Sequence, residues 1–104
     1  MRTIKLLNTD LNVSRLCLGT LNFGTVLTQD QVFRHMDIFL EHGGNFIDTA
    51  HVYSNWIPGP LSRSEKMLGE WIRGNDRKQI ILATKGGHFD FSAPETSRDR
   101  KSVV

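Results

Sequence analysis

The stretch that decides the fold reads GGNFIDTAHVY and spans residues 43–53. Its two glycines suit the end of a helix, because glycine adopts the left-handed backbone that closes a helix at no steric cost. Phe46 and Ile47 form a short apolar run typical of a buried strand, and Asp48 places a carboxylate where that strand ends. Tyr53 follows five residues later. The stretch therefore predicts a helix end, a buried strand and a loop that together carry two titratable side chains.

Two helices are predicted, one on each side of this strand. Apolar side chains recur every three or four residues over residues 29–42 and again over residues 63–73, which indicates amphipathic helices. Each begins with a capping box, in which a serine or threonine and a residue three positions later satisfy each other's backbone N–H groups. The two capping boxes are Thr28-x-x-Gln31 and Ser62-x-x-Glu65.

Further extended segments are predicted on both sides of the helices. Residues 3–7 and 12–16 flank a polar turn and suggest a hairpin. Residues 16–18 form an apolar run that opens into a loop, and we expect Cys17 within it to be a small core residue. Residues 80–83 form another apolar run and predict a third buried strand.

Apolar strands that alternate with helices are typical of parallel βαβ units. Two architectures share this pattern, an open doubly wound sheet and a (β/α)8 barrel. A dinucleotide-binding open sheet would carry a Gly-x-Gly-x-x-Gly turn after its first strand. Here that turn, Gly19 to Gly24, has only the outer two glycines. The predicted fold class is therefore α/β, and the barrel is favoured.

The length limits how much of a barrel can form. A full (β/α)8 barrel takes about 250 residues, whereas this chain has 104. We expect the N-terminal part of a TIM barrel, with about three βα units and a leading β-hairpin. Residues 1–104 would then be one incomplete domain, and its polar tail at residues 92–104 would fray. Two open parallel edges of such a sheet would favour self-association.

Composition and charge exclude several classes of protein. Hydrophobic residues make up 38% and charged residues 23% of the chain, as in soluble globular proteins. The net charge of +2 is spread along the chain, apart from a short basic cluster at residues 98–101, so we expect no nucleic-acid partner. We also expect no membrane span and no internal disulfide, since there is no long apolar stretch and only one cysteine. With no recognisable signal peptide, a cytoplasmic location is predicted.

Polar side chains stand at three predicted strand ends. In a parallel barrel the chemistry lies at the carboxyl ends of the strands, and Thr20, Asp48 and Lys85 each follow an apolar strand. Tyr53 lies in the loop after the second strand. Taken singly, such residues are ordinary turn formers, loop aromatics or solvated lysines. Taken together, they favour a functional site.

An aspartate, a lysine and a tyrosine in contact can act as a proton donor. Tyrosine alone is a weak acid near neutral pH, but an ammonium beside its hydroxyl stabilises the phenolate. An aspartate beside the lysine keeps the ammonium charged and in place. Such a group suits a carbonyl oxygen that gains negative charge during reduction. Because no side chain delivers hydride, a nicotinamide cofactor is implied.

Two stretches, residues 44–53 and residues 83–85, resemble the N-terminal signatures of a known family, the aldo-keto reductases. These are NADP(H)-dependent barrel enzymes that reduce aldehydes and ketones. The resemblance runs from the predicted hairpin to about Gly87, most of the chain. It implies a (β/α)8 fold, NADP(H) as the cofactor and a small carbonyl compound as the substrate.

The resemblance also implies a role for each site residue. Tyr53 would be the proton donor, Lys85 would make it a stronger acid, and Asp48 would pair with Lys85 and lie near the nicotinamide. Cofactor contacts are also implied for the loop after the first strand, at Gly19, Thr20 and Leu21.

The chain departs from the family pattern after the third predicted strand. The family's active-site histidine would fall beyond Val104, and His88 lies in the wrong place to replace it. The later barrel units, which hold the cofactor's adenosine and 2′-phosphate, are also missing. We therefore expect a truncated or fragment chain with little activity alone, and whether it is itself an enzyme stays open.

Two alternatives remain open at this level. The chain could be a non-catalytic relic or interaction module with the same partial barrel fold, which would bind no cofactor. It could also be a barrel aldolase in which Lys85 forms a Schiff base with the substrate, although the spacing of Asp48 and Tyr53 disfavours this hypothesis.

Overall fold

A computed structural model describes residues 1–88 and 100–103 of the chain. An N-terminal antiparallel hairpin forms one small sheet, and four further strands form a second sheet in the order β3-β4-β5-β6. The hairpin strands are β1 (Thr3–Lys5) and β2 (Asn12–Ser14). The second sheet contains β3 (Cys17–Gly19), β4 (Phe46–Asp48), β5 (Ile81–Gly86) and β6 (Arg100–Val103).

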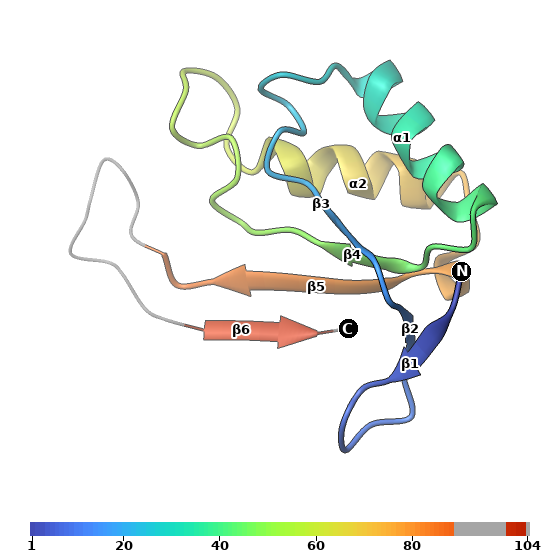
Figure 1. Cartoon of the computed structure of the whole chain (residues 1–104). Coiled ribbons are helices and arrows are strands. Elements are labelled where there is room, and N and C mark those ends of the chain that lie inside the picture. The colour runs from blue at the N-terminus through green and yellow to red at the C-terminus, as the bar shows by residue number, and fades with distance from the viewer. Residues whose placement is uncertain (89–99, 104) are drawn as a thin grey trace.

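Two α-helices connect the parallel strands, as predicted. Helix α1 (Gln29–Glu41) joins β3 to β4, and helix α2 (Arg63–Arg73), followed by a short 3-10 turn η1 (Arg77–Gln79), joins β4 to β5. Figure 1 shows both helices on the same side of the main sheet. The strands β3, β4 and β5 pair in parallel, which confirms the βαβ prediction.

The ends of helix α1 follow the sequence signals. The capping box at Thr28 and Gln31 is formed in full, so the predicted start is confirmed. The helix ends before Gly43, whose φ of +87° is the left-handed backbone that glycine adopts without strain. Asn45 then ties the start of β4 to the hairpin, because its side-chain oxygen accepts from the Ser14 N–H at 2.6 Å.

The second predicted capping box is wrong. Ser62 precedes α2 with φ at 57° and makes no capping hydrogen bond to the helix. Its hydroxyl instead donates to the carbonyl oxygen of His51 at 2.8 Å. Glu65 is also engaged elsewhere, since its carboxylate accepts from the Thr84 hydroxyl at 3.0 Å. Hydrogen bonds to residues distant in sequence therefore replace the predicted local cap.

The sheet edge at β5 also differs from the prediction. Residues 100–103, which were expected to lie in a frayed tail, form β6 and pair antiparallel with β5. The outer edge of β5 is therefore covered, and the two edges of the sheet are β3 and β6 rather than two parallel strands. The remaining residues of the predicted tail, 92–99 and 104, lie outside the described residues.

Cys17 is exposed, which corrects the expectation that it is a core residue. Successive side chains of a strand point to opposite faces of its sheet. Leu18 packs against the core on the helical side, so its neighbour Cys17 faces the side that neither α1 nor α2 covers. An apolar run in the sequence does not reveal that one face of the strand lacks a cover.

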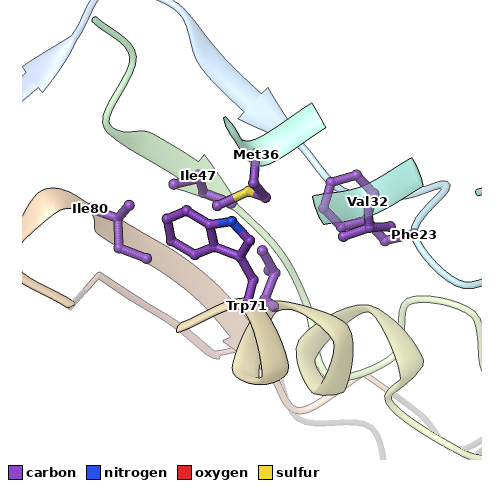
Figure 2. Packing of buried hydrophobic residues seen from close by; sticks show 7 residues of the cluster. Phe23, Val32, Met36, Ile47, Trp71 and Ile80 are labelled. Atoms are coloured by element: carbon purple, nitrogen blue, oxygen red, sulfur yellow. The ribbon is translucent and has the colours of Figure 1, made fainter. Parts of the chain in front are cut away.

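The core lies between the sheet and the two helices (Figure 2). Its buried members come from the β3–α1 loop, both helices, β4 and the residue before β5, and are Phe23, Val32, Met36, Ile47, Leu68, Trp71 and Ile80. The Trp71 indole N–H of α2 also donates to the carboxylate of Asp37 in α1 at 2.9 Å, so the helices are joined by a polar contact at the edge of the core. No helix within residues 1–88 is long and apolar enough to cross a bilayer.

Replacing Ile47 with alanine should destabilise the fold far more than the same change at Ile38. Ile47 is 0% exposed at the centre of the sheet, whereas Ile38 is 48% exposed on α1. Ile47→Ala should lower the free energy of unfolding by about 2–5 kcal/mol because it leaves a cavity, and Ile38→Ala should change it by about 0.5 kcal/mol or less. Urea unfolding of both variants checks this, and equal losses would contradict the described core.

Candidate active site

The parallel register of β4 and β5 brings two charged side chains together. Asp48, the last residue of β4, pairs with Ala83 of β5. Lys85 lies two residues further along β5, so it points to the same face of the sheet as Asp48. Its ammonium donates to Asp48 Oδ2 at 2.8 Å and to the carbonyl oxygen of Thr49 at 3.0 Å. The predicted ion pair is therefore present.

Tyr53 reaches the same place through the loop that follows β4. The N–H of His51 donates to the carbonyl oxygen of Lys85 at 3.1 Å, so the loop runs beside the end of β5. The Lys85 ammonium lies 4.8 Å from the centre of the Tyr53 ring. The Trp56 ring also contacts this phenol in an edge-to-face arrangement, with ring centres 6.4 Å apart.

The electrostatics of the cluster keep Lys85 charged. Partial burial alone would lower the pKa of Lys85. The hydrogen bond with the Asp48 carboxylate and the attraction of its negative charge, together with the neighbouring Tyr53 side chain, outweigh the burial and raise this pKa above its ordinary value of 10.5. Lys85 is therefore an ammonium ion throughout the neutral pH range.

The structure thus brings together three of the predicted site residues, namely Asp48, Tyr53 and Lys85. The loop after β3 is adjacent, because Gly19 pairs with Asp48. Gly19 and Leu21 are exposed there. Thr20 is placed differently from the expectation of a cofactor contact, since it is 0% exposed and its hydroxyl donates to the carbonyl oxygen of Asp48 at 3.0 Å.

Two residues of the site were missed by the sequence analysis. Thr49 supplies the second acceptor for the Lys85 ammonium through its backbone carbonyl. Ser64, in the first turn of α2, is hydrogen-bonded to both Thr20 and Thr49. Backbone carbonyls have no sequence signal, and a serine at a helix start is normally interpreted as a cap. Only the packing of α2 against the strand ends reveals both contacts.

A second polar cluster, which contains His51, Ser62 and Glu65, lies beside the site. The Ser62 hydroxyl and the Glu65 carboxylate approach the same ring nitrogen of His51, Nδ1, at 2.8 and 3.5 Å. A hydrolase triad needs the serine and the carboxylate on opposite nitrogens of the imidazole. This cluster is therefore not a nucleophile–base pair, and we assign it a structural contact between the loop and α2.

The comparisons with known proteins agree with this site. Residues 15–103 match the model of the Aldo/keto reductase family, and the chain belongs to this family. It is 43% identical over 79 residues to an uncharacterized oxidoreductase, YrpG, of Bacillus subtilis, a match that covers 74% of this chain and 24% of the relative. It is 45% identical over 84 residues to norsolorinic acid reductase stcV of Emericella nidulans, covering 72% of this chain and 20% of that protein.

One relative has a similar size. An uncharacterized 11.2 kDa protein of Pseudescherichia vulneris is 42% identical over 82 residues, which cover 76% of this chain and 80% of the relative. By contrast, the chain spans only about a quarter or less of the length of YrpG and the norsolorinic acid reductase.

Solved structures establish the fold class. An aldo-keto reductase from Bacillus halodurans, solved in its holo form, superposes with a TM-score of 0.70 at 36% identity, covering 86% of this chain and 27% of that enzyme. The Pseudomonas aeruginosa protein PA4992, described as an aldo-keto reductase, superposes with a TM-score of 0.69 at 32% identity. The match covers 82% of this chain and 31% of that protein. Such neighbours are (β/α)8 barrels, so the predicted fold, the N-terminal part of that barrel, is confirmed.

Replacing Asp48 with asparagine should destabilise the chain in a pH-dependent way. The change removes the charged partner of Lys85, which is about two-thirds buried, and should lower the free energy of unfolding by about 1–2 kcal/mol. Because the pKa of Lys85 is raised in the folded state, this stabilisation is fully present below pH 10.5 and is lost as the pH rises through the folded-state value.

Urea unfolding at neutral and at strongly alkaline pH measures this effect. Asp10→Asn is the matched control, since the ion pair of Asp10 with Lys5 spans 3.7 Å between exposed side chains and should contribute little at either pH. A loss for Asp48→Asn that equals the loss for Asp10→Asn, or that persists unchanged at high pH, would contradict the described ion pair.

Proposed function

We propose that this chain carries the proton-donating part of an NADPH-dependent carbonyl reductase, with Tyr53 as the donor. The observation that carries the proposal is the placement of one ammonium, Lys85 Nζ, 2.8 Å from the Asp48 carboxylate and against the Tyr53 phenol. Membership of the aldo-keto reductases supports an oxidoreductase role.

The residues around Asp48 fit a flat cofactor ring. Gly19 is opposite Asp48 in the sheet, and a side-chain carbon built on Gly19 would meet no atom of residues 1–88 within 4 Å. The open space beside the carboxylate suits the close approach of a nicotinamide and its ribose, with Gly19 and Leu21 as backbone contacts. When bound, NADPH supplies the hydride that the carbonyl carbon accepts.

The chain's own residues would manage the proton. The Tyr53 hydroxyl donates its proton to the carbonyl oxygen as that oxygen becomes an alkoxide, which leaves an alcohol and a phenolate. The Lys85 ammonium stabilises this phenolate by its positive charge, and Asp48 holds the ammonium in place. Water then returns a proton to Tyr53. The names of two relatives, norsolorinic acid reductase and aryl-alcohol dehydrogenase, support a redox reaction of this kind.

The raised pKa of Lys85 argues against the Schiff-base alternative. A lysine nucleophile must lose its proton, and enzymes lower the pKa of such lysines. Here the hydrogen bond to Asp48 and the neighbouring Tyr53 side chain act in the opposite direction, because both raise the pKa of Lys85. An assay of carbonyl reduction separates this proposal from the alternative of a non-catalytic interaction module with the same partial barrel fold.

We further propose that turnover needs more βα units of the barrel than the two in this structure. Positioning of reactants can contribute about 7–11 kcal/mol to catalysis, and charges act strongly only in a pocket that excludes water. Lys85 keeps a side-chain exposure of 33% and Asp48 one of 26%, so the cluster faces solvent on one side.

The isolated chain should therefore show little or no reductase activity. NADPH oxidation with 4-nitrobenzaldehyde measures this, with Tyr53→Phe as the matched control because it removes only the donating hydroxyl. Any slow oxidation should be the same for both proteins. Turnover at ordinary enzyme rates that depends on Tyr53 would show instead that the chain completes a site without further barrel units.

Grafting the chain into a complete barrel tests the proposed chemistry itself. Residues 1–88 should replace the matching part of the Bacillus halodurans enzyme and give an NADPH-dependent reductase. Tyr53→Phe in this chimera should lower kcat by about 100-fold or more, whereas His35→Ala, at an exposed position on α1, should leave it unchanged. A folded chimera that binds NADPH but has no Tyr53-dependent activity would support the interaction-module alternative.

A further inference from the structure

Three hydroxyl groups are buried together behind the ion pair. Thr20 follows β3, Thr49 follows β4, and Ser64 lies in the first turn of α2, and each of the three residues is 0% exposed. Ser64 Oγ lies 2.8 Å from Thr20 Oγ1 and 3.1 Å from Thr49 Oγ1. Ser64 is thus the point at which α2 joins the ends of both strands.

Counting protons gives these hydrogen bonds a single direction. A hydroxyl has one proton to donate. Thr20 donates its proton to the carbonyl oxygen of Asp48 at 3.0 Å, so Ser64 must be the donor toward Thr20, whose hydroxyl and carbonyl oxygens accept at 2.8 and 3.0 Å. Because the proton of Ser64 is then committed, Thr49 donates to Ser64. The chain of donation runs from Thr49 through Ser64 and Thr20 to the backbone of Asp48.

Both ends of this hydroxyl chain hold an acceptor of the Lys85 ammonium. Thr49 accepts from Lys85 Nζ through its carbonyl oxygen at 3.0 Å, and Asp48 accepts through Oδ2 at 2.8 Å. Within the described residues Ser64 makes no hydrogen bond to Lys85 or Tyr53, but it is linked to Asp48 through Thr20 and directly to Thr49, the two residues that bind the ammonium.

We propose that Ser64 is a positioning residue, which acts through the buried hydroxyl chain to hold the Asp48 and Thr49 acceptors around the Lys85 ammonium. The inference rests on the proposed function only in that this ammonium would assist Tyr53. Burial of three hydroxyls is costly unless each is satisfied, and here all three are. Hydrogen-bonded chains of this kind also strengthen one another in a buried setting.

The rate at which the Lys85 ammonium protons exchange with water reports directly on this positioning. Uniformly ¹⁵N-labelled chain, without cofactor or substrate, should give a slowly exchanging ammonium signal near neutral pH that disappears in Lys85→Arg. Ser64→Ala should accelerate this exchange to the rate of the exposed lysines Lys66 and Lys78, because both acceptors become free to move.

Three further variants separate positioning from general loosening. Thr49→Val removes the donor hydroxyl but keeps the side-chain shape, and it should also accelerate exchange. Thr49→Ser keeps the hydroxyl, and Leu68→Val loosens the core of the same helix without touching the chain of hydroxyls, so both should retain slow exchange. If Ser64→Ala fails to fold, the Thr49 pair decides alone.

Two results would overturn the proposal. One is slow exchange of Lys85 in folded Ser64→Ala and Thr49→Val. The other is fast exchange in Leu68→Val or Thr49→Ser to the same extent, which would indicate loss of rigidity in general. Neither result depends on reductase activity. If Tyr53→Phe did not change the activity of the chimera, the proposed function would be wrong, but the exchange rates would still test the positioning role of Ser64.

Discussion

The parallel pairing of β4 with β5 is the constraint on which the site depends. It sets Asp48 opposite Ala83 and so places Lys85, two residues later, on the same face and within 2.8 Å of the carboxylate. Side chains alternate along a strand, so a slip of one residue would turn Lys85 to the other face. The ion pair is therefore a direct consequence of strand register.

That register is in turn specified by the core. Ile47 is buried under the helices between two residues, Phe46 and Asp48, that face the other side of the sheet. A slip of one residue would turn Ile47 away from the helices and expose it to water. It would also bury the Asp48 carboxylate against apolar side chains, at a cost of several kcal/mol. The packing that stabilises the sheet thus also orients the charged groups.

Features with local causes could be predicted from the sequence. Helix α1 has its cap, its apolar stripe and its glycine stop within about 16 consecutive residues, and each agrees with the structure. The ion pair could also be predicted, because parallel strands bring their carboxyl ends to one edge. The spacing of five residues places Tyr53 in the loop after β4, but its contact with Lys85 also depends on the hydrogen bond from the His51 N–H to the Lys85 carbonyl oxygen.

Features that depend on distant partners could not be predicted. Ser62 has the sequence of a cap, yet its hydroxyl is bonded to His51. Thr20 stands at a strand end like Asp48, but Ser64 of α2 encloses it, so it is buried rather than cofactor-facing. Cys17 lies in an apolar run, but neither α1 nor α2 covers the face to which it points. In each case the arrangement of elements distant in sequence decides the outcome, and no local pattern reveals it.

The central claim is that the Lys85 ammonium stabilises the phenolate of Tyr53. Lys85→Met in the barrel chimera keeps the Tyr53 hydroxyl but removes the positive charge, which lies 4.8 Å from the centre of the ring. The decisive measurement is kcat for NADPH-dependent carbonyl reduction by the native chimera, by Lys85→Met and by Tyr53→Phe. The account predicts that Lys85→Met lowers kcat about as far as Tyr53→Phe, because the phenolate then forms without a compensating charge. A folded Lys85→Met chimera that binds NADPH and keeps the native kcat would contradict it.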